Sequence, residues 1–436
     1  MTSNYVFRAF GLFSFVLLTA LGASGCLRDE CEATRTFRYW KPIYALIEDF
    51  RKPIAVEGAR EMCEPGQLYY YQDYLFVAEP GEGVHIINNQ DPAAPAVVAF
   101  LPIQGAEDMA IVNDYLYVNN YIDLVVFRLN TPATPEYAGR LEEAFPFHGQ
   151  YDPGLGYLVE WQETNETMQL PCSDPNSNQD WFWWGGGVLV DVAFDINIAT
   201  VNTLESSSNG SIRGAGIGGS LARFTIAKNN LYVVDNTSLR VFSLSDPVAP
   251  QRQQSIPIGW GIETIFPYGD NLFIGSQSGM FIFDNSNPLA PVQIGVFEHA
   301  RACDPVFATG NRAYVTLRDG TNCQNFINQL DVVDISDLRN PRLIRTHPMH
   351  RPIGLSLVDD RLFLCDDDQG LKLFDASDDH LIGQRLLDRA ANFQARDVIA
   401  LPQRQVAIVI GPDGLRQFDF SQTDKLLPLS HLPVCR

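Results

Sequence analysis

Basic residues are scarce in this chain of 436 residues. Lysine and arginine number 31 against 52 aspartates and glutamates, which gives a formal net charge of −21. A protein that holds a nucleic-acid backbone needs a basic surface to neutralise the phosphates. The composition therefore excludes nucleic acid as a partner. An acidic surface instead suits solubility, cations or basic partners.

Closely spaced cysteine pairs are also missing. The chain has eight cysteines, and none of them forms a CxxC pair. A structural zinc site and a thioredoxin-like redox motif are therefore not indicated. The glycines of GAGIGG (214–219) have dinucleotide-binding spacing, but they lack the buried strand before them and the helix after them that such a site needs. No catalytic signature stands out, so we predict no catalytic residue and expect no organic cofactor.

Long apolar runs are confined to the N-terminus. Residues 10–23 are apolar but too short to span a bilayer comfortably, which is typical of a secretory signal peptide. The small residues at 23–25 precede Cys26, as in a bacterial lipobox. We predict a lipoprotein-type signal peptide over residues 1–25, a lipid anchor on Cys26 and a short linker to residue 37. The alternative is an ordinary cleaved signal peptide.

The predicted anchor sets the expected location. Several acyl chains on one cysteine would hold the protein durably at a membrane, whereas one chain alone binds only marginally. Leu27 after Cys26 is compatible with sorting to the outer membrane. We therefore predict an exported protein, lipid-anchored at the bacterial cell envelope in the outer membrane.

What the chain has in abundance is a repeat. Residues 239–250 read LRVFSLSDPVAP, and residues 280–291 read MFIFDNSNPLAP. A short strand trio precedes each such stretch, starting at residues 75, 116, 157, 231, 272, 313, 362 and 406. Short apolar runs separated by glycine, aspartate and proline turns indicate an all-β protein. A four-stranded sheet recurring about every forty residues is typical of a β-propeller blade.

The repeat predicts the architecture. We expect an all-β protein, a β-propeller with eight blades of about 41 residues, and seven blades as the alternative. A single propeller domain would cover residues 38–436, with an insertion at about 160–219. Residues 43–51 read as a short helix. The segments 52–58 and 425–435 are candidates for closing the ring by placing strands from both termini in one blade.

A resemblance to a known family rests on these residues. The stretches CDPVFATGNRAYVTLRDGTNC (303–323) and NQLDVVDISD (328–337) resemble the LVIVD-repeat family of exported bacterial β-propeller proteins. The likeness extends over roughly residues 38–425. The resemblance implies a surface or envelope protein and brings no assigned activity with it.

The repeat also provides a coordinate system for a site. Nine residues before each trio the innermost strand begins, near the mouth of the central channel. That column reads Gly66, Glu107, His148, Ala222, Glu263, Asp304, Ile353 and Asp397. We predict a ring that binds a cation such as Ca²⁺ or a polar ligand, formed by Glu107, His148, Glu263, Asp304 and Asp397. The alternative is that these carboxylates accept hydrogen bonds from backbone amides of neighbouring loops.

Tryptophans mark a second candidate surface. Trp181, Trp183 and Trp184 fall in a long loop predicted at residues 160–187, and Trp260 lies just ahead of the fifth inner strand. Exposed aromatic side chains on a polar insert commonly mark a contact, here with a protein or glycan at the cell envelope. The alternative is a loop that folds over and buries its own rings. Cys303 and Cys323 map to one face of one unit, which predicts a disulfide between them.

Three classes of function remain open at this point. The leading interpretation is a non-enzymatic binding module at the envelope. Its competitor is a propeller hydrolase or lyase that uses the acids at the channel mouth, with His148 as base. The third is a scaffold with no ligand of its own. A fold does not by itself dictate a function, so the site has to decide.

Overall fold

The computed structural model describes residues 34–147, 149–171, 174–179, 181–184, 186–191, 216–299, 305–319 and 328–435. The chain divides into two compact units. The smaller comprises residues 1–43 and 160–198, and the larger comprises residues 44–159 and 199–436. Among the described residues, no helix has both the length and the apolar character that crossing a membrane requires.

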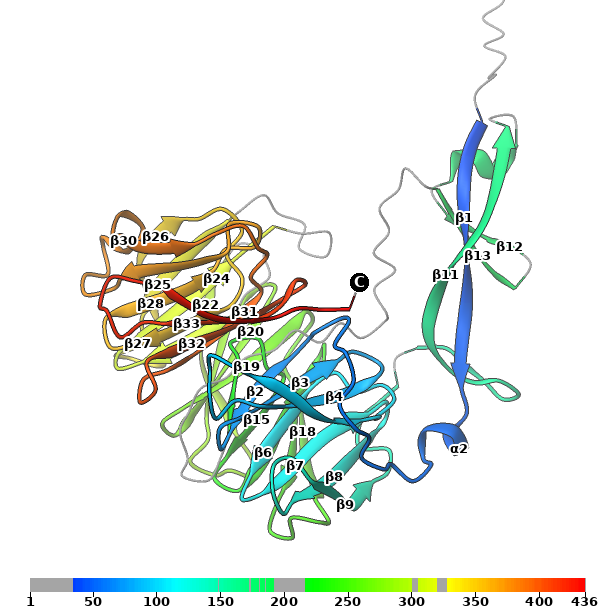
Figure 1. The fold of residues 1–436 in the computed structure, drawn as a ribbon, viewed down its shortest axis with the longest axis horizontal. Helices are drawn as coiled ribbons and strands as arrows, with labels where there is room; N and C mark the ends of the chain where they lie inside the picture. Colours follow the sequence, from blue (N-terminus) through cyan, green and yellow to red (C-terminus); the bar gives the residue numbers. More distant parts are fainter. Residues whose placement is uncertain are drawn as a thin grey trace, which may run out of the picture. The chain divides into compact units, whose positions relative to one another are not determined.

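The larger unit contains repeated four-stranded antiparallel sheets, the blades of a propeller (Figure 1). The first blade consists of β2 (Leu68–Tyr71), β3 (Tyr74–Glu79), β4 (Gly83–Asn88) and β5 (Ala96–Leu101). The second consists of β6 (Met109–Val112), β7 (Tyr115–Asn120), β8 (Asp123–Leu129) and β9 (Pro135–Leu141). The third consists of β15 (Phe224–Ala227), β16 (Asn230–Val234), β17 (Ser238–Ser243) and β18 (Gln251–Pro257).

Four more blades follow in chain order. The fourth consists of β19 (Ile262–Tyr268), β20 (Asn271–Ser276), β21 (Gly279–Asp284) and β22 (Val292–Glu298). The fifth consists of β23 (Val306–Thr309), β24 (Arg312–Leu317), β25 (Gln329–Asp334) and β26 (Arg342–Pro348). The sixth consists of β27 (Leu355–Val358), β28 (Arg361–Cys365), β29 (Leu371–Asp375) and β30 (Leu386–Ala390). The seventh consists of β31 (Asp397–Leu401), β32 (Val406–Gly411), β33 (Gly414–Asp419) and β34 (Leu427–Leu432).

The recurring Asp-Pro and Asn-Pro motif makes the turn between the third and fourth strands of a blade. The side chain of the first residue accepts a hydrogen bond from the backbone N–H two residues on, as Asp91 does from Ala93 at 2.9 Å. Asp246 and Asn287, which also precede a proline, accept in the same way, and so do Asp337 and Asp378, which do not precede one. Such a side chain satisfies a turn donor locally, and a proline next to it fixes φ and cannot continue a strand. The repeated letters therefore encode a repeated turn.

The blades close into a ring. The inner strand β6 contacts both β2 and β15, and contacts then run from β15 through β19, β23 and β27 to β31. Blade 7 meets blade 1 in a buried cluster that joins Ile399 and Ile408 to Leu68 and Leu75. The amides of Asn89 and Gln417 exchange hydrogen bonds across the same junction, at 2.9 and 2.7 Å. In the described part of the chain the ring therefore has seven blades, the alternative count rather than eight.

The third predicted repeat unit does not form a blade. Its residues 157–159 begin the long strand β11 (Gly156–Pro171), which follows β10 (Tyr151–Asp152), and its residues 188–191 lie in β13 (Gly187–Asp191). Strand β13 pairs with β1 (Thr34–Ala45) on one side and with β12 (Trp181–Trp184) on the other. Residues 38–43, predicted as part of one propeller domain, thus belong to the smaller unit, together with a short 3₁₀ turn at Pro175–Asn178.

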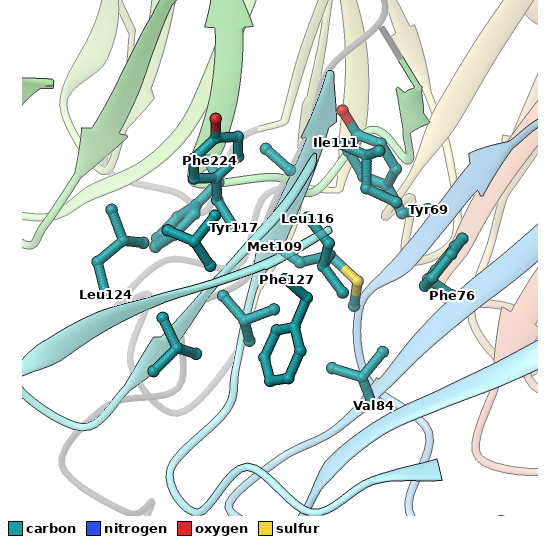
Figure 2. Close-up of a cluster of buried hydrophobic side chains, with 14 of the residues drawn as sticks. Tyr69, Phe76, Val84, Met109, Ile111, Leu116, Tyr117, Leu124, Phe127 and Phe224 are labelled. Atoms are coloured by element: carbon teal, nitrogen blue, oxygen red, sulfur yellow. The ribbon is translucent and has the colours of Figure 1, made fainter. Parts of the chain in front are cut away.

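The hydrophobic core lies between neighbouring blades. Figure 2 shows one such cluster, in which Phe76 and Val84 of blade 1 and Met109 and Phe127 of blade 2 are fully buried. Phe224 of blade 3 packs into the same cluster. Each sheet buries both faces against its neighbours, so the inner strands read as continuous apolar runs and not as alternating ones. Burial of this kind contributes roughly 1.5–3 kcal/mol for each large apolar side chain.

A disulfide joins the two ends of the propeller. Cys63 precedes blade 1 and Cys435 follows blade 7, and the bond between them spans 372 residues of sequence. The N–H of Cys435 also donates to the carbonyl of Met62 at 2.7 Å. The sequence predicted closure by strand exchange instead. That prediction was wrong, because Glu57 in segment 52–58 bridges to Phe100 of blade 1 and the four strands of blade 7 all follow residue 396.

The predicted short helix within residues 43–51 is confirmed as α2 (Ile47–Phe50). Phe50 is buried and packs edge-to-face on Tyr121, with ring centroids 5.3 Å apart. Arg51, at its end, forms a two-pronged ion pair with Asp123. Burial alone would raise the pKa of Asp123, but the hydrogen bonds from Arg51, Glu143 N–H and Arg140 hold that pKa below its usual range. The ionised carboxylate fastens the segment before blade 1 to blade 2.

Candidate functional site

The inner strands of the ring surround a piece of the chain itself. Residues 216–223, which we call the central segment, lead into blade 3. Within it, β14 (Ile217–Gly218) pairs with Tyr69 and Tyr70 of β2. The N–H of Gly216 donates to the carbonyl of Ile111 in blade 2 at 2.9 Å, and that of Gly219 donates to the carbonyl of Leu68 at 3.1 Å. The central segment therefore lies against several blades at once.

Asp397, one of the predicted ring residues, binds the central segment. Its Oδ1 accepts hydrogen bonds from the N–H and the hydroxyl of Ser220, both at 2.8 Å, and its Oδ2 accepts the N–H of Leu221 at 3.3 Å. The Ser220 hydroxyl in turn accepts the N–H of Leu355 in blade 6 at 2.6 Å. The side chain of Asp397 is 1% exposed. For this carboxylate the structural alternative is the one observed.

Asp108, just before blade 2, also binds the central segment, and we call the region around this segment the hub. Its Oδ2 accepts the N–H of Arg223 at 2.7 Å and that of Phe224 at 2.8 Å, while its Oδ1 accepts the N–H of Met109 at 2.6 Å. The residue is fully buried. The column read from the repeat spacing names Glu107, one residue before Asp108, and so it missed Asp108. A carboxylate at the first turn of an apolar inner strand was the signal that could have identified it.

Two glycines of the GAGIGG stretch allow the central segment to lie close to Asp397 and Tyr69. A Cβ on Gly219 would lie 1.9 Å from Asp397 Oδ2, and one on Gly216 would lie 2.2 Å from the ring of Tyr69. Neither distance is sterically allowed, so only glycine fits while the segment keeps its place. The glycines at these positions are therefore explained by packing at the hub and not by binding the phosphates of a dinucleotide.

Two further predicted ring residues, Glu107 and Glu263, lie near the guanidinium of Arg223. The Nε of Arg223 donates to the carbonyl of Glu263 at 3.2 Å, and the residue is 8% exposed. Burial lowers the pKa of Arg223, while Glu107, Glu263 and Asp108 oppose that shift. The column read from the repeat spacing names Ala222 in this unit, so it missed the neighbouring Arg223.

Positive charge at the hub changes the expectation for a cation. Among the described residues, no group of three or more histidines, cysteines, aspartates or glutamates could hold a metal ion. Arg223 itself supplies a cation beside Glu107 and Glu263. His148 and Asp304, the other two predicted ring residues, lie outside the described residues, and the question of Ca²⁺ stays a prediction for them.

Trp260 is the most exposed of the large hydrophobic side chains described, at 79%. It lies three residues before Glu263, in the loop that leads into β19. Gly261, next to it, has a left-handed φ of 73°, and the N–H of Gln277 donates to its carbonyl at 2.8 Å. The amide of Gln277 also donates to Glu263 Oε1 at 3.2 Å. An indole, an amide and a carboxylate thus belong to one loop pair beside Arg223.

The other predicted aromatic residues lie in the smaller unit. Trp181 and Trp183 are on β12, a strand where a loop was predicted, and they are 50% and 56% exposed. Trp183 meets Trp161 of β11 edge-on, with ring centroids 5.5 Å apart. Half-exposed rings fit neither complete self-burial nor a fully free contact surface. The side chain of Trp184 lies outside the described residues.

Three predicted cysteine roles cannot be placed. Cys26, Cys303 and Cys323 lie outside the described residues, so the anchor and the disulfide between the last two stay predictions. Cys365 is buried and free, and burial raises the pKa of its thiol well above the ordinary value. A thiol in that state packs as a small apolar side chain.

Comparisons with known proteins agree with the fold. The LVIVD repeat family model matches residues 301–347. A functionally unknown protein from Desulfotomaculum acetoxidans DSM 771 is similar over 83% of this chain and 97% of its own, at 11% identity and a TM-score of 0.51. The computationally designed Ika8 protein is similar over 90% of this chain and 92% of its own, at 10% identity and a TM-score of 0.50.

A weaker likeness, with 8% identity and a TM-score of 0.45, joins 83% of this chain to 97% of BamB from Moraxella catarrhalis. None of the curated proteins matches the sequence. At identities this low, the two likenesses with TM-scores of 0.50 and 0.51 support the fold alone. Together with the closed ring of blades and the matched repeat, these two likenesses lead to one conclusion. The chain is a β-propeller protein that carries an LVIVD repeat.

Proposed function

We propose that this protein is a non-enzymatic binding module whose ligand is a glycan of the cell envelope. The site is the loop pair at the channel mouth formed by Trp260, Glu263 and Gln277, with Arg223 behind it. One observation carries the proposal: an indole that is 79% exposed lies in the loop next to a hydrogen-bonded carboxylate–amide pair. An aromatic face and convergent polar groups are the usual components of a small-ligand site.

The chemistry of the four side chains suits a sugar. An indole presents a flat apolar face on which the C–H face of a sugar ring can lie. Glu263 offers acceptors for hydroxyl groups, while Gln277 and Arg223 offer donors. Because Arg223 is almost fully buried and its Nε is already bonded to the chain, it needs little further ordering to bind.

Catalysis by the hub acids is the competing function, and the contacts at the hub argue against it. A glycoside hydrolase typically needs two carboxyl groups that are open to substrate and differ in their protonation. Asp108 and Asp397 instead accept backbone N–H groups and are buried by the central segment. Glu263 shares its Oε1 with Gln277. Asp108 and Asp397 are thus used to hold the central segment against the blades.

Replacing Trp260 with alanine is expected to weaken glycan binding at least about tenfold, because truncating an aromatic anchor typically costs more than 1 kcal/mol. Binding would be measured by isothermal titration with the envelope glycan that the wild-type protein selects on an array. The double variant Trp181→Ala/Trp183→Ala is the matched control, since it removes two exposed indoles from the other unit. Loss of binding in that control alone would place the site on the smaller unit and reject the proposal. Release of reducing ends from the bound glycan would reject the non-enzymatic assignment.

We also propose that the protein is exported and lipid-anchored at the envelope, in the outer membrane, through Cys26. Replacing Cys26 with alanine is expected to move most of the protein from the membrane fraction to the soluble exported fraction and to abolish labelling by a fatty-acid analogue. Cys31→Ala is the control, because it removes a neighbouring cysteine and leaves the lipobox intact. Equal labelling of the Cys26→Ala and wild-type proteins would show that this residue is not the anchor.

A further inference from the structure

A pocket lies between blades 2 and 3. Its volume is about 360 Å³, within the range of ligand-binding pockets. Ile122, Phe147 and Tyr157 form apolar parts of its wall, and Arg240, Arg252 and Glu143 contribute charge. All six residues belong to the larger unit. Two arginines therefore line one small pocket in a chain with a net charge of −21.

Arg240 is held in place by the loop beside it. Its Nε donates to Asp235 Oδ2 at 2.8 Å, and its side chain is 24% exposed. Asp235 in turn accepts the N–H groups of Thr237 and Ser238 at 2.9 and 2.8 Å. The loop therefore fixes one edge of the guanidinium, and in the described part of the chain its terminal nitrogens have no hydrogen-bond partner. Fixing a binding group beforehand reduces the entropy lost when a ligand binds.

Arg252 has more unused capacity. One of its terminal nitrogens donates to the carbonyl of Glu142. Within the described ranges, no carboxylate lies within ion-pair distance of its guanidinium. A guanidinium has five N–H donors and matches a carboxylate in two-pronged geometry. Arg252 is thus positioned by the backbone while most of its donors stay open.

The rest of the wall fixes the shape and polarity of the ligand. Phe147 and Tyr157 pack edge-to-face at 4.7 Å, which makes a rigid aromatic corner. Glu143 lines the pocket from a backbone position with a left-handed φ of 53°, where its N–H donates to the buried Asp123. A glutamate in that conformation is uncommon and persists only where the surroundings hold it. Its carboxylate can accept a hydroxyl group.

We propose that this pocket binds a small carboxylic acid with a hydroxylated ring. The acid is held by Arg240 and Arg252, the ring lies against Phe147 and Tyr157, and a ring hydroxyl donates to Glu143. The shared chemistry is found both in phenolic acids and in uronic sugars. The pocket lining shares no residue with the site around Trp260, so failure of this proposal leaves the proposed function untouched.

The test measures binding of 4-hydroxybenzoate and glucuronate to the full chain by isothermal titration and saturation-transfer NMR. Their neutral counterparts are 4-hydroxybenzamide and glucose. We expect one acid to bind at least about tenfold more tightly than its neutral counterpart, and added salt to weaken that binding. The acid that binds identifies the phenolic or the sugar source.

Replacing Arg252 with glutamine is expected to weaken binding of that acid at least about tenfold, because the shorter, neutral amide loses both the charge and the forked donors of the guanidinium. Arg342→Gln on the outer strand of blade 5 is the matched control and should bind as the wild type does. Trp260→Ala should also leave this binding unchanged. Equal binding of acid and neutral probe, equal loss in both arginine variants, or no binding of either acid at about 10 mM would overturn the proposal.

Discussion

Replacing Gly219 with valine is expected to lower the free energy of unfolding by about 3 kcal/mol or more. The new Cβ would lie 1.9 Å from the carboxylate of Asp397, and neither partner can move without breaking buried hydrogen bonds. Urea unfolding followed by tryptophan fluorescence measures the change. Gly58→Ala is the matched control, because nothing lies within 4 Å of a Cβ at that position.

The partner substitution tests the same junction from the other side. Asp397→Ala leaves the N–H groups of Ser220 and Leu221 buried without their acceptor, at roughly 1–3 kcal/mol for each group. Because both substitutions disrupt one contact, the double variant should lose less unfolding free energy than the sum of the two single losses. Full additivity, or wild-type stability of Gly219→Val, would show that the central segment does not depend on Asp397.

Removing the disulfide is the second large effect. The double variant Cys63→Ser/Cys435→Ser is expected to lose about 2–5 kcal/mol of unfolding free energy, because the bond restricts an unfolded chain over almost its whole length. The bond spans 372 residues, and it fastens the ends of the ring where blade 1 meets blade 7. Thermal unfolding with and without a reductant provides the measurement.

The reductant serves as an internal control for this variant. It should lower the midpoint of the wild-type protein to that of the double variant and leave the variant unchanged. Hydrogen bonds from the N–H groups of Cys63 and Glu64 to Glu79 Oε1 still hold the first segment after reduction. The ring should therefore remain folded at moderate temperature. A midpoint that reductant does not change in the wild type would contradict the prediction.

The residues predicted at the channel mouth show what a column read from repeat spacing leaves out. The column named Glu107, Glu263 and Asp397; in the structure Asp397 binds the central segment, and Glu107 and Glu263 lie near Arg223. It missed Asp108 and Arg223, which lie one residue further along. A column read from spacing has an uncertainty of about one residue in each strand, and adjacent side chains in a strand point to opposite faces.

By itself the sequence determined what depends on near neighbours along the chain. Strand pairs within one blade are joined by short turns, and side chains such as Asp246 satisfy those turns two residues away. Those signals identified the propeller, the short helix α2 and the LVIVD repeat, because the pattern that predicts each of them lies within about forty residues of sequence.

Only the tertiary structure decided which distant segments meet. Residues 188–191 look like a blade strand, yet they pair with β1, about 150 residues earlier. The hydrogen bonds of this pairing join backbone groups, and any extended segment could form them. Ser220 reaches Asp397 across 177 positions, and Cys63 reaches Cys435 across 372. Backbone hydrogen bonds and thiols carry no information about the identity of their partner. These groups find their partners because the closed ring brings Ser220 next to Asp397 and Cys63 next to Cys435.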